Sequence, residues 1–220
     1  MMEFAAWMAE QPQQVKDEAQ GRVDAALGRA EFYARGGVLD GFCLCSDCCF
    51  NDDPFFSPTM FEEFVWPYLS QLIAGYRELG FYVIKHTDGN IMPILEALVA
   101  AGPHAVDSLD PQGGVDLAEV KRRVGRRVCL IGNVSCAVLD TGSDEEVVAS
   151  VRYALRHGMP GGGYFHQQLH IHRHGLEAVR ADAGGVAAGG RLRLKCRRPL
   201  VAPQPARSGQ PCRLFGGPMK

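Results

Sequence analysis

The feature that most constrains the fold of this chain is an alternation of short apolar, strand-like runs with stretches of helical periodicity. We predict strands at 38–45, 81–86, 105–109, 127–133 and from 161 onward. Apolar residues at helical spacing occupy the intervals between them. Five strands separated by four helices, at intervals this short, indicate right-handed parallel crossovers. The chain is therefore an α/β protein, either a (β/α)₈ barrel or a doubly wound sheet.

Local signals place several of the helices. Spacing predicts a helix over 13–35, and Ser57-Pro58 should start another with a capping residue and a first-turn proline. Pro67 lies inside that second stretch and should kink it. Asp116 should cap a helix that runs to about Val124, and a capping box at 143–146 should open one that runs to about His157.

The polar residues that follow the strands favour a barrel over an open sheet. Asp47, Asp110 and Asn133 each follow a predicted strand, as do His86 and Asp88. Both fold types place their chemistry at the carboxyl ends of the strands. A Gly-x-Gly-x-x-Gly fingerprint between strand and helix is missing, which argues against Rossmann-type cofactor binding. We expect a partial (β/α)₈ TIM barrel with about five of the eight units.

The stretch 81–90, FYVIKHTDGN, is the centre of this prediction. Its first half is typical of a buried strand, and the segment from His86 should be the loop that ends it. His86 and Asp88 would then point into a catalytic site. The alternative is that Asp88-Gly89 forms an ordinary turn and that His86 is a satisfied polar residue at a strand end.

Four of the eight cysteines, Cys43, Cys45, Cys48 and Cys49, crowd into one short segment. No second pair follows at the spacing of a zinc ribbon or finger. Because Cys43 and Cys45 alternate with Phe42 and Leu44, we interpret them as reduced, buried thiols on one face of a strand.

The composition is that of an ordinary globular protein, with 46% hydrophobic and 22% charged residues. No run of eighteen apolar residues suggests a membrane span, and the first residues carry an acid and no basic segment. We expect a cytoplasmic protein that does not contact membranes.

The chain divides into three expected segments: a helical 1–36, the partial barrel at 37–165, and a basic, low-complexity tail at 166–220. The tail holds ten Lys and Arg against two acids, whereas residues 1–165 hold thirteen against twenty-three. It lacks interleaved aromatic residues, so we expect no nucleic-acid binding, and its composition predicts disorder. We hypothesise that it is a frame-shifted translation. The alternatives are a histidine-rich metal-binding tail and an ordinary flexible extension.

Five motifs in unbroken order resemble the uroporphyrinogen decarboxylase (URO-D) family, which includes decarboxylases of haem biosynthesis and zinc methyltransferases acting on corrinoids and thiols. The motifs fall between about 38 and 165: DPFFSP with the following FEEFVWPY, HTDGN, LDPQGGVDL with Val120-Lys121, LIGNV, and GGGY. The resemblance implies a TIM barrel with its active-site cleft at the carboxyl ends of the strands. It also implies a further amino-terminal portion of the barrel, to which no motif here corresponds.

The resemblance implies two alternative activities. In the decarboxylase-like one, His86, Asp88 and Asp110 would be catalytic, Asp47, Asn51 and Asn133 would line the cleft, and no cofactor would be needed. The substrate would be a tetrapyrrole, uroporphyrinogen. In the methyltransferase-like one, His86 and Asp88 would hold zinc for a methylated corrinoid or thiol, although Asp88 replaces a cysteine ligand of that family. An inactive fragment that retains the scaffold is a third alternative, and a homodimer or a complementing amino-terminal segment would be the expected partner.

Overall fold

The computed structural model describes residues 2–166, apart from the side chain of Met2, and these belong to one unit of the chain. Its sheet has five strands: β1 (Gly41–Cys45), β2 (Tyr82–Thr87), β3 (Ala105–Ser108), β4 (Cys129–Gly132) and β5 (Tyr164–Phe165). They lie in the order β1-β2-β3-β4-β5, and every neighbouring pair is parallel. Each strand therefore lies beside its successor in the sequence, without the reversal of strand order that defines a doubly wound sheet. This order is that of a barrel wall and confirms the predicted fold class.

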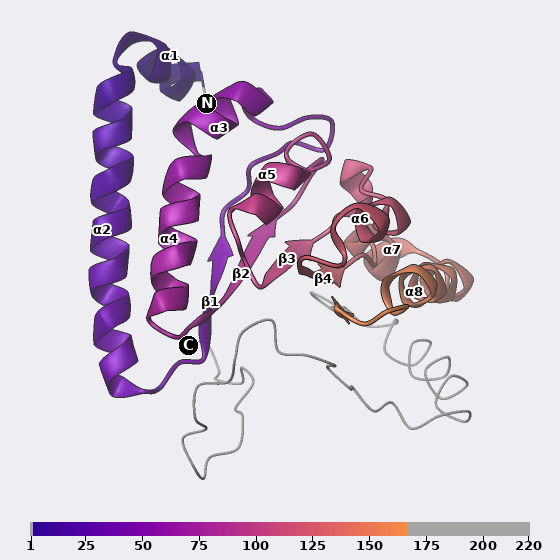
Figure 1. Ribbon diagram of the computed structural model, residues 1–220. Coiled ribbons are helices and arrows are strands. Elements are labelled where there is room, and N and C mark those ends of the chain that lie inside the picture. Colours follow the sequence, from indigo (N-terminus) through magenta and orange to yellow (C-terminus); the bar gives the residue numbers. More distant parts are fainter. Residues whose placement is uncertain (1, 167–220) are drawn as a thin grey trace. The chain divides into compact units, whose positions relative to one another are not determined.

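Helices lie between all successive strands (Figure 1). Between β1 and β2 are α3 (Pro58–Phe64) and α4 (Trp66–Glu78), and α5 (Leu95–Ala100) precedes β3. A short η1 (Pro111–Gly113) and α6 (Leu117–Val124) precede β4, and α7 (Cys136–Thr141) and α8 (Asp144–Gly158) precede β5. Two further helices, α1 (Met2–Glu10) and α2 (Pro12–Gly36), come before the sheet, and α2 packs against α4. Within residues 2–166, no helix is both long and apolar enough to cross a bilayer.

The stretch around Pro67 differs from the predicted single kinked helix. Its residues form two helices, with Val65 as the last cap of α3 and the first cap of α4. Proline has no N–H to donate to the carbonyl four residues earlier, and its ring crowds that carbonyl, so the helix breaks two residues before it, at Val65. Ser57 caps α3 as predicted, its side chain accepting a hydrogen bond from the Met60 N–H.

The core lies between the sheet and these helices. Its largest cluster joins α5, α6 and α8 to β3 and β4 and includes Leu95, Val106, Leu117, Leu130 and Val151. A second cluster joins α2 and α4 to β1 and β2, where the rings of Phe42 and Tyr76 stack at 4.4 Å. Side chains of a strand alternate between faces, so the residues next to these core positions project from the other face of the sheet.

Candidate functional site

The strand register gathers polar side chains into one row near the carboxyl ends of three strands. Cys45 of β1 pairs with His86 of β2, and His86 pairs with Asp107 of β3. His86 thus belongs to the strand, which continues to Thr87, rather than to the predicted loop. The strand continues because β3 extends alongside it, so that Ser108 pairs with Thr87. Chain segments more than sixty residues apart in sequence therefore meet at one place.

His86 and Asp107 form the best-defined pair of the site. The imidazole Nδ1 lies 2.9 Å from Asp107 Oδ2, a hydrogen-bond distance. The Asp107 side chain is only 5% exposed and that of His86 is 18% exposed. A carboxylate that accepts a hydrogen bond from Nδ1–H holds the ring so that Nε2 faces outward as the reactive nitrogen.

The other oxygen of Asp107 has no hydrogen-bond partner among the described residues, although it is buried. Burial raises the pKa of the Asp107 carboxyl, the hydrogen bond and charge of His86 lower it, and the charge of Asp88 raises it again. The net direction is upward, because removing a carboxylate from water disfavours its charged form. A buried, unpaired oxygen of this kind is a ready acceptor for a ligand N–H or O–H.

Sequence reasoning missed Asp107. The residue lies within the apolar run 105–109, which predicts only a strand, and the predicted catalytic acid is Asp110 beyond it. An acid at an alternating position of an otherwise apolar strand is a signal that could have identified it, because a buried carboxylate is rare without a partner.

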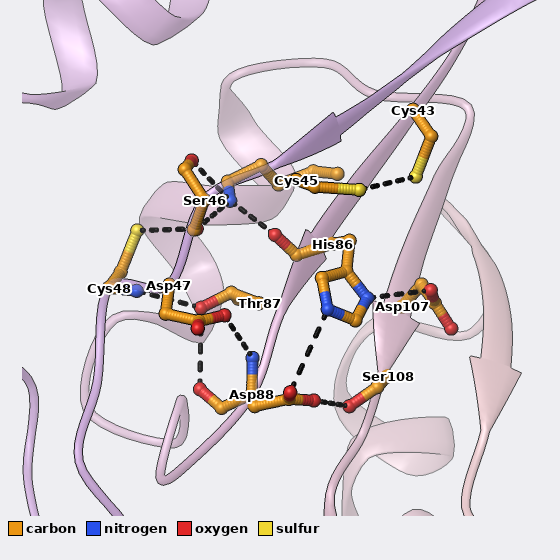
Figure 2. A network of polar contacts seen from close by, with 11 residues as sticks. Cys43, Cys45, Ser46, Asp47, Cys48, His86, Thr87, Asp88, Asp107 and Ser108 are labelled. Carbon is orange, nitrogen blue, oxygen red and sulfur yellow. Dashed lines mark hydrogen bonds and ion pairs between the residues drawn. The ribbon is translucent and has the colours of Figure 1, made fainter. Parts of the chain in front are cut away.

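Asp88 faces the outer side of the imidazole (Figure 2). Its Oδ2 lies 3.8 Å from His86 Nε2, and its Oδ1 accepts a hydrogen bond from the Ser108 hydroxyl. The Asp88 N–H donates to Asp47 Oδ1 at 3.1 Å, which joins the loop after β1 to the loop after β2. The predicted residues Asp47, His86 and Asp88 are therefore brought together.

A buried lysine supports this arrangement from the helix side of the sheet. Lys85 is 1% exposed, and its ammonium donates to the carbonyl and hydroxyl of Ser46, at 2.6 and 3.1 Å, and to the His86 carbonyl. Burial lowers the pKa of Lys85. The Thr87 hydroxyl accepts from the Cys48 N–H at 2.9 Å. These bonds fix the ends of β1 and β2 relative to each other.

The site opens into a cavity of about 310 Å³. Three carboxylates line it, those of Asp88, Asp107 and Asp110, and no lysine or arginine does. The remaining lining residues are His86, Ser108, Pro111, Gln112, Gly132, Val134 and Cys136. A cavity with this charge favours a ligand that offers N–H donors or acquires positive charge.

The local structure gives two of the other three predicted residues, Asp110 and Asn133, a structural role. Asp110 Oδ1 accepts from the Gln112 N–H at 2.9 Å, so it caps η1 while lining the cavity. Asn133 is buried outside the cavity lining, where its amide donates to the Leu109 and Val115 carbonyls. Asn51 is exposed in the loop after β1 and does not line the cavity. Their contact with a substrate remains a prediction.

The donor types at the site are compatible with a metal ion. One ligand atom each from Asp47, His86 and Asp88 lie within 4.8 Å of one another. Imidazole nitrogen and carboxylate oxygen are both zinc ligands, and a carboxylate behind the imidazole is the usual support for a metal-binding histidine. The set contains no sulfur, which distinguishes it from a thiolate-rich zinc site.

The profile of the family "Uroporphyrinogen decarboxylase (URO-D)" matches residues 2–177. The chain belongs to the URO-D family. The match extends on both sides beyond the stretch 38–165 that carries the motifs, and it includes α1 and α2. The predicted tail at 166–220, including the frame-shift hypothesis, lies outside the described residues except for His166.

Individual relatives agree with this assignment. The chain is 30% identical over 129 residues to a uroporphyrinogen decarboxylase of Shewanella loihica, an alignment covering 54% of this chain and 33% of that protein. It is 32% identical over 102 residues to the chloroplastic uroporphyrinogen decarboxylase 2 of Arabidopsis thaliana, covering 46% and 25%. The chain thus matches about a third or less of the length of these URO-D relatives.

A solved structure shows the same fold. A methyltransferase from Methanosarcina mazei superposes with a TM-score of 0.65 and 20% sequence identity, over 84% of this chain and 52% of that one. At this identity the likeness concerns the URO-D fold and not the reaction.

Proposed function

We propose that this URO-D family chain carries a decarboxylase-like site, which removes an acetate carboxylate from a pyrrole substrate of the uroporphyrinogen class. The observation that carries the proposal is the His86–Asp107 pair, with its 2.9 Å hydrogen bond and the unpaired Oδ1 of Asp107 in a cavity lined by carboxylates. The named relatives of Shewanella and Arabidopsis support the choice of substrate class.

The chemistry needs an electron sink and a proton source. Protonation of the pyrrole ring produces a cation, which accepts the electron pair of the breaking C–C bond as carbon dioxide leaves. A proton then adds to the former acetate carbon, and the ring gives up its extra proton. The net change replaces one carboxylate by one proton and yields a methyl group and carbon dioxide.

The residues of the cavity match these steps. Asp88, Asp107 and Asp110 surround the position of the cationic ring with negative charge, which lowers the energy of the protonated intermediate. The Asp107 Oδ1 is free to accept a pyrrole N–H. His86, held through Nδ1, presents Nε2 for proton transfer, alone or through Asp88 at 3.8 Å.

The test is consumption of uroporphyrinogen by the full chain under anaerobic conditions after treatment with a chelator. Carbon dioxide release and the less carboxylated porphyrinogens, oxidised for fluorescence detection, are measured. Loss of proton transfer should reduce the rate of His86→Gln and Asp107→Asn at least about 100-fold. Asp17→Asn on the exposed face of α2 makes the same chemical change away from the site and should retain the rate. Equal rates in wild type, His86→Gln and Asp107→Asn would overturn the proposal.

A zinc-dependent methyl transfer is the second candidate, and the grouping of Asp47, His86 and Asp88 favours it. These three residues would hold the zinc, which when bound would activate a thiol as its thiolate. Asp107 would orient His86 for that purpose. Here His86→Ala should lower the zinc bound by the full chain by one equivalent, and methylation of a thiol by a methylated corrinoid should require zinc. Chelator-resistant release of carbon dioxide would instead favour decarboxylation.

A further inference from the structure

A pair of thiols outside the cavity lining has no role in the proposed decarboxylation. Cys43 and Cys45 lie two positions apart on β1, so their side chains project from the same face of the strand. Both are exposed and both are free, which corrects the expectation of buried thiols. The Cys45 Sγ donates to the Cys43 Sγ at a distance of 3.5 Å (Figure 2).

The separation of the two sulfurs fits chelation of one metal ion. At a tetrahedral centre with Zn–S bonds of about 2.3 Å, two thiolate sulfurs lie about 3.8 Å apart. The pair on β1 is within a few tenths of an ångström of that value before any ion is bound. A disulfide would require the sulfurs to approach to about 2.05 Å. The 3.5 Å separation is therefore closer to that of a chelating pair than to that of a disulfide.

The other cysteines of the segment are engaged differently. The Cys48 Sγ donates to the Ser46 carbonyl at 3.6 Å, and Cys49 is buried in the core cluster. The chelating pair is thus limited to Cys43 and Cys45 within this segment. Cys45 is also the register partner of His86, which lines the cavity. The thiol pair therefore lies beside the cavity, but neither cysteine is among the residues that line it.

We propose that Cys43 and Cys45 form a bidentate site for a soft divalent cation with a filled d shell, of the Zn²⁺ or Cd²⁺ class. This site is distinct from the nitrogen and oxygen ligands of Asp47, His86 and Asp88. Binding breaks two S–H bonds, forms two metal–sulfur bonds and releases two protons, without oxidation or reduction. Two sulfur ligands select a soft cation, whereas the carboxylates beside the cavity suit harder ones.

The first test is titration of the reduced, metal-free full chain with Cd²⁺, followed by the ultraviolet charge-transfer absorption of thiolate-bound cadmium. Cys43→Ser and Cys45→Ser should each lose the whole chelate, so the double variant should lose no more than either single one. Cys136→Ser, which removes an exposed thiol on α7, should keep the absorption, as should Asp88→Asn. Cys196→Ser and Cys212→Ser, at positions outside the described residues, should keep it as well.

Two results would overturn the proposal: wild-type absorption in both Cys43→Ser and Cys45→Ser, or half-losses that add in the double variant, as expected of independent thiols. A second test uses the unmodified chain and so does not depend on the folding of variants. At a cadmium concentration about ten times the Kd, alkylation of Cys43 and Cys45 should slow about tenfold, as the fraction of free thiol falls. Peptide mapping should show no such protection at Cys136, and equal alkylation with and without cadmium at Cys43 and Cys45 would refute the site.

Discussion

At the residue scale, the site contains the Asp107 carboxylate, whose burial disfavours its charged form. Asp107 is buried, one of its oxygens lacks a partner among the described residues, and its pKa is raised. A raised folded-state pKa means that the protonated form stabilises the fold. That contribution is fully present below the ordinary pKa of 3.8 and is lost as the pH rises through the raised value.

Asp107→Asn should therefore increase the free energy of unfolding at neutral pH while it slows the proposed decarboxylation. Asparagine keeps the shape of the side chain and its carbonyl can still accept from the imidazole, but it carries no buried charge. This increase in the free energy of unfolding should shrink as the pH falls below 3.8, where Asp107 of the wild type is protonated in both the folded and the unfolded state. Urea unfolding at neutral and acid pH measures this difference. An Asn variant that is less stable than wild type at neutral pH would contradict the expectation.

Lys85 differs from Asp107, because its buried ammonium has hydrogen-bond acceptors in the Ser46 and His86 carbonyls. Lys85→Met removes the donor to the Ser46 and His86 carbonyls and should lower the free energy of unfolding by about 1–3 kcal/mol. Lys16→Met is the matched control, because its partner Glu63 is 49% exposed and such a pair contributes at most about 1 kcal/mol. Denaturant midpoints of the two variants compare the effects. An equal decrease in the free energy of unfolding in both variants would show that the Lys85 hydrogen bonds do not stabilise the ends of β1 and β2.

At the element scale, the helices begin where side chains satisfy their free N–H groups. Ser143 accepts from the Glu146 N–H, and the Glu146 side chain accepts from the Ser143 N–H, so both halves of the predicted capping box are present on α8. Asp116 likewise accepts from the Ala118 N–H at the start of α6. These caps are local, which is why the residue pattern predicted them correctly.

Ser143→Ala should lower the free energy of unfolding by about 1 kcal/mol, because it removes the Oγ that accepts from the Glu146 N–H, whereas the Ser143 N–H can still donate to the Glu146 side chain. Ser150→Ala within the same helix makes the same chemical change away from the cap. It should stabilise slightly, by a few tenths of a kcal/mol, since alanine has the higher helix propensity. Thermal unfolding followed by circular dichroism compares the two. A loss of similar size in Ser150→Ala would refute the capping account.

At the scale of the whole molecule, the sheet of the described residues ends in a strand edge. β1 pairs with β2 on one side only, and the strand carries unpaired backbone groups on its other side. Exposed apolar side chains include Tyr82 at 66% and Phe165 at 54% on strands β2 and β5. We propose that a second copy of the chain or a complementing amino-terminal segment covers the free edge of β1 and these apolar side chains.

The chain by itself should therefore associate as its concentration rises. Sedimentation velocity over a range of concentrations should show species larger than the 24.0 kDa monomer. A monomer at every concentration, with a single sharp thermal transition, would contradict this expectation. A change confined to the cavity, such as His86→Gln, should leave the association unchanged and serves as the control.

The sequence by itself determined the alternation of strands and helices, the caps at Ser57, Asp116 and Ser143, and the barrel class. These depend on periodicity and on bonds between residues a few positions apart. Its motifs also indicated the URO-D family and selected His86 and Asp88 as candidate site residues. Helix boundaries near Pro67 and the length of β2 were less accurate, because neighbouring strands decide how far a strand extends.

Only the tertiary structure decided which polar residues meet. The strand register placed Asp107 behind His86 and Cys45 beside it, and it separated Asn51 and Asn133 from the cavity. Register joins residues that are far apart in the chain, so no local pattern encodes it. The role of the buried Asp107 carboxylate follows only from the alignment of parallel strands, because its partner His86 belongs to another strand. The pairing of Cys43 with Cys45, by contrast, follows from the alternation of faces within one strand.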